Sequence, residues 1–141
     1  MSFLYLLDTN IISELSKPVI DKNVLINFSR KQYLSAVSAI TLQELLLGYE
    51  LLPNGKRKEQ LNHFIDIIIR NFEIIPYERN AASYYAEIAS KCQKSGNIRP
   101  VCDTQIAATA LANNMILATR NEKDFIPMQA VSSLKIENWF L

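Results

Sequence analysis

The sequence has very few of the residues that several common catalytic designs require. Of 141 residues, one is histidine and three are glycine. His63 lies in a helix-like stretch where we expect it at the surface, so a Ser-His-Asp or Cys-His apparatus has no support. The three glycines form no Gly-rich phosphate loop, which excludes the Rossmann and P-loop motifs; they are Gly48, Gly55 and Gly96.

The chain also lacks a disulfide framework and long apolar runs. Its two cysteines, Cys92 and Cys102, have no metal-ligand spacing, and we expect both to be packing residues, although Cys102 precedes Asp103. Runs such as Phe3–Leu7 are far too short to span a membrane. The N-terminus shows no basic flank followed by a secretory core. We therefore expect a cytoplasmic protein without a membrane segment.

The composition is that of an ordinary globular protein. Hydrophobic residues make up 49% of the chain and charged residues 21%, which argues against disorder. The length suits one domain, which we expect to span residues 1–141. Because the formal net charge is only +1, any surface that binds nucleic acid must be local.

Strand-like and helix-like stretches alternate along the chain. We expect strands at 3–7, 33–37, 72–75, 115–118 and, at an edge, 134–137. We expect helices at 11–16, 21–31, 40–50, 59–71, 81–94 and 103–113, with a basic turn at 52–58 and a polar loop around 124. This alternation predicts an α/β protein with a parallel sheet covered on both faces. The strand-to-helix turns then share one edge of the sheet, where ligands bind.

Four acidic residues fall at that edge. Asp8 follows the first expected strand, and Glu44 lies in the opening turns of the helix after the second. Asp103 begins the helix that leads to the fourth strand, and Asp124 follows that strand. The predicted topology therefore gathers four carboxylates, although more than a hundred residues separate the first from the last.

Each acid also has an ordinary structural explanation. Asp8 and Asp103 are types that cap helices, and Thr41 to Glu44 fits a capping box. Asp124 fits a solvated loop. We favour the joint functional interpretation for Asp8, Asp103 and Glu44, and leave both interpretations open for Asp124.

Clustered carboxylates raise one another's pKa, and a divalent cation removes that penalty. Mg²⁺ takes oxygen ligands, often one or two carboxylates with waters and substrate phosphates. The acidic cleft therefore suggests phosphodiester chemistry assisted by a metal.

The ordered motifs around these acids resemble the PIN-domain family, and most closely the VapC-type ribonuclease toxins of type II toxin–antitoxin pairs. The similarity covers essentially the whole chain. The motifs are Leu6-Leu7-Asp8-Thr9-Asn10, Glu44 with Gly48, Asp103-Thr104-Gln105-Ile106-Ala107-Ala108, Ala118-Thr119-Arg120-Asn121 with Asp124-Phe125, and the ending Lys135-Ile136-Glu137-Asn138-Trp139.

The resemblance implies a three-layer α/β/α sandwich and Mg²⁺- or Mn²⁺-dependent endonucleolytic cleavage of structured RNA, tRNA or rRNA. Asp8 and Asp103 would be the principal metal ligands, and Glu44 would ligate the metal or orient the attacking water. Many PIN domains carry an acid where this chain has Asn121. Asp124 either supplies that charge from a shifted position, as a fourth catalytic acid, or the fourth acid is absent.

We assign substrate binding to residues that flank these acids: Thr9, Asn10, Arg99, Arg120, Asn121 and Lys123. The basic trio Lys56-Arg57-Lys58 is more typical of a solvated turn. The resemblance also implies a homodimer and a cognate antitoxin, for which apolar surface on the expected helices 11–16 and 40–50 offers a seat.

Two alternatives to a nuclease are a non-catalytic PIN-fold binding module and a receiver-like phosphoacceptor. Asn121 in place of an acid favours a catalytically weak or inactive PIN-fold module that binds RNA or protein. A receiver-like phosphoacceptor needs an aspartate at the end of a central strand. The third expected strand ends in Ile75-Pro76 instead, which argues against that class.

Overall fold

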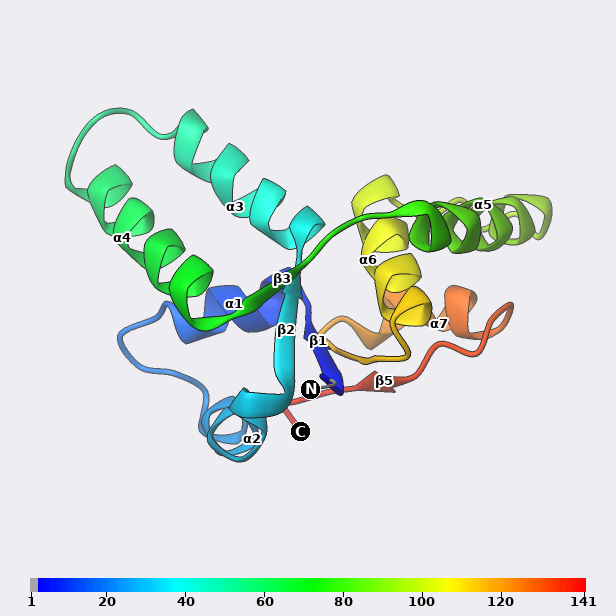
Figure 1. Cartoon of the computed structure of the whole chain (residues 1–141), viewed down its shortest axis with the longest axis horizontal. Helices are drawn as coiled ribbons and strands as arrows, with labels where there is room; N and C mark the ends of the chain where they lie inside the picture. Colours follow the sequence, from blue (N-terminus) through cyan, green and yellow to red (C-terminus); the bar gives the residue numbers. More distant parts are fainter. Residues whose placement is uncertain (1–2) are drawn as a thin grey trace.

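A computed structural model describes residues 3–141 and places a five-stranded sheet between two layers of helices (Figure 1). The strands lie in the order β3-β2-β1-β4-β5, and all four neighbouring pairs are parallel. Their bounds are β1 Tyr5–Leu7, β2 Ser35–Ser38, β3 Glu73–Ile75, β4 Ile116–Ala118 and β5 Ile136–Glu137. The predicted parallel sheet is confirmed, with β5 at one edge.

Seven α-helices and one short 3₁₀ helix accompany the strands within residues 3–141. The α-helices are α1 Thr9–Leu15, α2 Lys22–Lys31, α3 Ala39–Leu51, α4 Lys56–Asn71, α5 Arg79–Lys94, α6 Val101–Ala112 and α7 Glu122–Gln129; the 3₁₀ turn is Gln32–Leu34. None of these helices has both the length and the apolar character needed to cross a membrane.

Alternating side chains of the strands form two separate cores, one on each face of the sheet. Leu6 and Leu117 pack on one face with residues of α5, α6 and α7. Leu7 and Val37 pack on the other face with residues of α1, α2, α3 and α4. Figure 1 shows these two helical layers on either side of the strands, which confirms the three-layer α/β/α sandwich.

The strand order creates a reversal at β1. From β1 the chain moves outward through β2 to β3, then crosses the sheet and adds β4 on the other side of β1. Leu7 of β1 pairs with Ala118 of β4, and the Asp8 N–H donates to the Ala118 carbonyl at 2.9 Å. The turns that follow β1 and β4 therefore adjoin at the point where open α/β sheets bind ligands.

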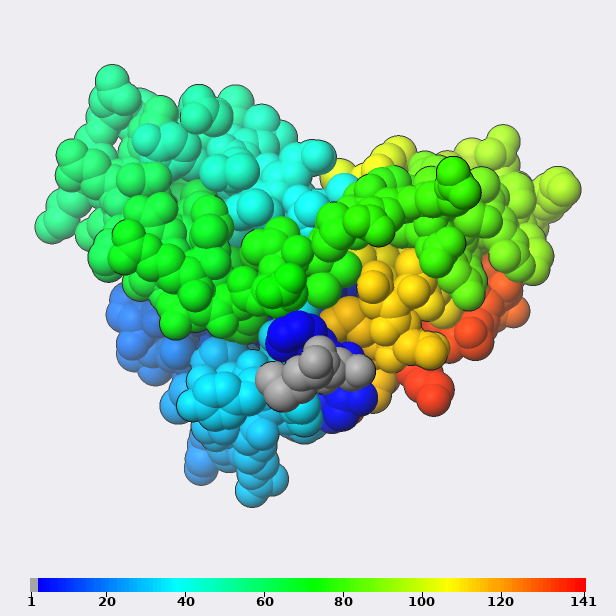
Figure 2. All heavy atoms as spheres, viewed as in Figure 1, coloured from blue at the N-terminus to red at the C-terminus, as the bar shows by residue number. Residues whose placement is uncertain are grey.

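The surface is indented beside this edge of the sheet. In Figure 2 the α3–α4 hairpin forms one projecting lobe and α5 another, with a notch between them at the end where β2 leads into α3. The first turns of α3 and α6 face this region (Figure 1).

Two expectations about secondary structure are wrong. The expected polar loop around Asp124 is the helix α7, whose buried residues are Phe125 and Met128. Two apolar positions three apart are a weak helical pattern, and Pro127 signalled a break. The basic trio Lys56-Arg57-Lys58, expected in a turn, instead forms the first residues of α4. The chain turns between α3 and α4 and completes this turn at Gly55, whose φ of 152° favours glycine.

Candidate active site

Asp8 connects the end of β1 to α1. It is the N-cap of α1, with Oδ1 accepting from the Thr9 N–H at 2.8 Å. Its Oδ2 accepts from the Thr119 hydroxyl at 2.8 Å and from the Asn10 amide at 3.1 Å. Asp8 is only 4% exposed, yet it lines the pocket at the carboxyl edge of the sheet. The capping and functional interpretations are therefore compatible for this residue.

Glu44 does not take part in the capping box that was expected from the sequence. The N-cap of α3 is Ser38, whose Oγ accepts from the Thr41 N–H at 3.0 Å. Glu44 instead accepts from the Thr9 hydroxyl at 2.6 Å through Oε1. A contact between α1 and α3 thus holds one carboxylate oxygen in place.

Asp103 lies in the first turn of α6, two residues beyond the start of the helix. The cap position is taken by Pro100, so the capping explanation for Asp103 is wrong. The side chain is half-buried, and this burial raises its pKa. Asp124 and then Glu44 raise it further, whereas Arg99 opposes them. Asp103 is therefore an acid with acidic neighbours at a helix N-terminus.

An open pocket of about 410 Å³ brings most of the predicted residues together. It takes side chains from the turns after β1 and β4 and from α1, α3 and α6. The lining residues are Asp8, Thr9, Asn10, Ser13, Glu14, Lys17, Glu44, Asp103, Arg120 and Asn121. Seven of the ten residues predicted for catalysis or substrate binding are in this set.

Three predicted residues are outside the pocket lining: Arg99, Lys123 and Asp124. Arg99 donates from Nη1 to the Asp124 carbonyl at 3.3 Å, which ties the α5–α6 connection to α7. Asp124 lies in the first turn of α7, near enough to Asp103 to raise the pKa of that acid. Asp124 is thus a neighbour of the acidic group, outside the lining itself.

Four polar residues of this site, Ser13, Glu14, Lys17 and Thr119, were assigned no role from the sequence. Ser13 and Glu14 follow Asn10 by three and four residues, which is one face of a helix, so helical spacing could have found them, whereas Lys17 lies just beyond the end of α1. Thr119 is fully buried and binds Asp8 across 111 residues of sequence. No local signal marks that contact.

Burial dominates the electrostatics of Asp8 and raises its pKa from 3.8 to about 6. Hydrogen bonds from Thr119 and Thr9 oppose this rise, while Asp103 and Glu44 add to it. Ionised Asp8 is therefore costly in the absence of a cation, as expected for carboxylates gathered in a partly dry pocket.

The donor set fits a hard cation that takes few protein ligands. Within residues 3–141 no three His, Cys, Asp or Glu side chains form a group that could together hold a metal ion. Mg²⁺ is commonly held by one or two carboxylates and keeps several waters. Asp8 and Asp103 offer carboxylate oxygens in one pocket. The other lining residues include no Cys, Met or His, the ligands that softer metals prefer.

The fold and the pocket define a class: α/β/α domains with an acidic cleft at the switch point of a parallel sheet. The model of the PIN domain matches residues 5–129, and the chain belongs to the PIN domain family.

Several relatives are similar over most of their length. Ribonuclease VapC2 of Rickettsia felis is 32% identical over 137 residues, covering 96% of this chain and 98% of that protein. Toxin FitB of Neisseria gonorrhoeae is 37% identical over 125 residues, covering 85% and 89% of the two chains.

Solved structures show the same arrangement. The crystal structure of FitAcB from Neisseria gonorrhoeae has a chain with a TM-score of 0.85 and 33% identity, covering 97% of this chain and 99% of that chain. The crystal structure of VapBC2 from Rickettsia felis, bound to a DNA fragment from its promoter, gives a TM-score of 0.82 at 30% identity, covering 97% and 99%.

Proposed function

We propose that the protein is a Mg²⁺- or Mn²⁺-dependent endoribonuclease that acts as the toxin of a toxin–antitoxin pair on structured RNA, tRNA or rRNA. The observation that carries the proposal is the convergence of Asp8, Glu44 and Asp103 in one pocket at the switch point of the sheet. The relatives named ribonuclease VapC2 and toxin FitB support it.

Asp8 and Asp103 would hold the cation, which when bound activates water and neutralises charge that develops on the phosphate. A carboxylate has about four acceptor positions. Three on Asp8 are used by Thr9, Thr119 and Asn10, which leaves about one for a ligand bond. Asp8 is thus fixed in direction before anything binds.

Glu44 would orient the attacking water or add a ligand oxygen. The Thr9 hydroxyl occupies Oε1 at 2.6 Å, and this bond sets the direction of the free oxygen, Oε2. Thr9 Oγ1 also lies 3.2 Å from Thr41 Oγ1, which links Thr9 of α1 to the first turn of α3. In this scheme Thr9 is a positioning residue for Glu44.

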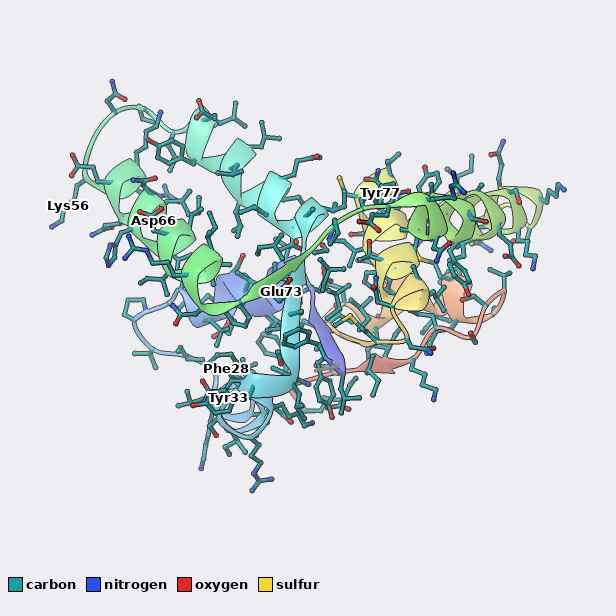
Figure 3. The ribbon with its side chains drawn as sticks, viewed as in Figure 1. Phe28, Tyr33, Lys56, Asp66, Glu73 and Tyr77 are labelled. Atoms are coloured by element: carbon teal, nitrogen blue, oxygen red, sulfur yellow. The ribbon has the colours of Figure 1, made fainter. Side chains whose placement is uncertain are left out.

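Cleavage of total RNA by the purified protein, with Mg²⁺ or Mn²⁺ and with EDTA, tests the proposal. We expect discrete products that disappear in EDTA and in Asp8→Asn and Asp103→Asn. Asp66→Asn is the matched control, because Asp66 is an exposed acid on α4 (Figure 3). Full activity in both pocket variants, or cleavage that persists in EDTA, contradicts the proposal.

The competing function is a PIN-fold module that binds RNA or protein with little or no catalysis. Asn121 favours it, since an amide lines the pocket where many relatives place an acid. Failure to bind Mn²⁺ by calorimetry, together with absence of cleavage, would favour this alternative. Loss of activity in Asp124→Asn would instead assign the missing charge to Asp124.

A cognate antitoxin and a homodimer complete the proposal. The VapBC2 and FitAcB structures support a partner protein. The seat expected on the helices 11–16 and 40–50 adjoins a groove of about 430 Å³ that extends onto α4, and we propose this groove as the docking site. It is lined by Ser16, Gly48, Leu52, Arg57, Gln60, Leu61 and Phe64. Sedimentation of the purified chain tests the dimer.

Gly48→Arg tests the groove, because Gly48 lines it and a Cβ at this position meets nothing within 4 Å. We expect the variant to lose co-purification with the co-expressed antitoxin. The control is Ser90→Arg, on an exposed face of α5. Equal capture by both variants would remove the groove from consideration.

A further inference from the structure

The pocket lining contains both acidic and basic side chains. The carboxylates Asp8, Glu44 and Asp103 come from the turn after β1 and from α3 and α6. Lys17, just beyond the end of α1, and Arg120, in the turn after β4, also line the pocket. In the absence of a cation, these acids repel an RNA phosphate, so attraction at the pocket must come from its basic side chains.

Lys17 is tethered at the pocket by Glu14. Its ammonium donates to Glu14 Oε1 at 2.8 Å, and the other oxygen of Glu14 accepts from the Asp21 N–H at 2.8 Å. These two hydrogen bonds are the main causes that lower the pKa of Glu14, which is 6% exposed. The Lys17 side chain remains 55% exposed and keeps two of its three donors for a ligand.

Arg120 is held from behind, and its guanidinium remains available. The guanidinium carbon lies 4.5 Å from the centre of the Phe140 ring. The backbone N–H of Arg120 donates to Asn10 Oδ1 at 3.0 Å. Within residues 3–141 the guanidinium makes no hydrogen bond, and the residue is exposed. The contact with the ring restrains the guanidinium, while its five donors make no hydrogen bond within the described residues.

The C-terminal segment that carries Phe140 is firmly anchored. Trp139 is fully buried and donates from Nε1 to Glu137 at 3.0 Å, and Glu137 pairs with Lys31 of α2. The Asn23 amide donates to the Phe140 carbonyl at 3.1 Å. These contacts hold Phe140 in a fixed position against Arg120.

We propose that Lys17 and Arg120 form a binding site for an RNA backbone phosphate that flanks the bond at the carboxylates, with Glu14 and Phe140 as positioning residues. This inference rests on the proposed function, because RNA is its ligand. A planar, pre-oriented guanidinium suits two phosphate oxygens, and the ammonium adds a second charge. Phosphate contacts supply much of nucleic-acid affinity.

Salt dependence of binding tests the site without cleavage. The probe is a short fluorescein-labelled single-stranded RNA of mixed sequence, bound in EDTA and followed by anisotropy over a range of salt concentrations. Each of Lys17→Met and Arg120→Met should weaken binding and reduce the slope of log affinity against log salt by about 0.7.

Lys91→Met is the matched control, because Lys91 forms a similar ion pair with Glu87 on α5 at 3.0 Å, outside the pocket lining. This variant should keep the wild-type affinity and slope. An unchanged slope in both Lys17→Met and Arg120→Met overturns the inference.

A double variant separates phosphate binding from simple neutralisation of Glu14. If Lys17 only cancels the charge of Glu14, Lys17→Met together with Glu14→Gln restores the affinity, which overturns the inference. If Lys17 contacts phosphate, the double variant keeps the reduced slope. Phe140→Leu should weaken RNA binding, and Phe140→Tyr should restore it by returning a flat ring beneath Arg120.

The binding assay and the RNA-cleavage assay together distinguish the phosphate site from the proposed nuclease activity. RNA that is bound with the expected salt slopes but never cleaved supports the phosphate site and contradicts the nuclease. RNA that is cleaved while Lys17→Met and Arg120→Met bind like wild type supports the nuclease and contradicts the phosphate site.

Discussion

The strongest test of the electrostatic account concerns Asp8 in the absence of metal. Folding raises the pKa of this carboxyl from 3.8 to about 6, chiefly through burial. The folded protein therefore binds this proton more tightly than the unfolded chain. The stabilising contribution is complete below the unfolded pKa and is lost as the pH rises through about 6.

The size of the effect follows from the two pKa values. The difference between an unfolded pKa of 3.8 and a folded pKa of about 6 corresponds to about 3 kcal/mol of unfolding free energy over the whole titration. Between about pH 4.5 and about pH 8 the Asp8 contribution should fall by about 2 kcal/mol, since the unfolded chain is already largely ionised at the lower pH. The variant Asp8→Asn has no such titration, because its side-chain amide does not ionise in this range.

Urea unfolding of wild type and Asp8→Asn in EDTA, at those two pH values, provides the measurement. The absolute stability of the variant also reflects changed hydrogen bonds to Thr119 and Asn10, so the comparison is the difference between the two pH values. Wild type should lose about 2 kcal/mol more than the variant. Parallel pH profiles would refute the argument that burial controls this carboxyl.

Three further changes give distinct outcomes. Thr119→Val removes the 2.8 Å hydrogen bond to Asp8 and should weaken Mn²⁺ binding by about 10–100-fold in calorimetry; unchanged affinity would show that this contact does not orient the ligand. Trp139→Ala deletes a fully buried side chain and should lower the free energy of unfolding by about 3–5 kcal/mol in urea; a loss below about 1 kcal/mol would contradict its anchoring role. Gly48→Ala, within α3 and with open space around the new Cβ, should raise stability by about 1 kcal/mol in thermal unfolding, and destabilisation would show that the glycine is needed for the helix itself.

The sheet and the three pocket acids could be predicted because their signals are local. Short apolar runs followed by polar turns mark buried parallel strands, and the crossover rule then places their carboxyl ends together. Neither signal depends on side-chain packing. Together they predict that Asp8, Glu44 and Asp103 share one edge of the sheet, and in the structure these residues line one pocket.

The remaining parts depend on tertiary contacts that leave little trace in the sequence. Helix α7 presents only Phe125 and Met128 to the core and contains Pro127. The Thr119 hydroxyl reaches Asp8 only because β4 lies beside β1. Phe140 is an ordinary C-terminal aromatic residue until the chain places its ring under Arg120.

The same geometry explains why a destabilised carboxylate is kept at the centre of the fold. Asp8 begins α1, binds the turn after β4, and accepts three hydrogen bonds, each of which favours its ionised form. These bonds do not overcome the burial that raises its pKa, so the metal-free site still favours the proton. The proposed cation would supply the missing charge, and its binding would then stabilise the fold most at high pH, where the proton is absent. We expect Mg²⁺ to raise the unfolding temperature of wild type more near pH 8 than near pH 5. The rise should be smaller in Asp8→Asn. An equal shift at both pH values would mean that the cation binds elsewhere.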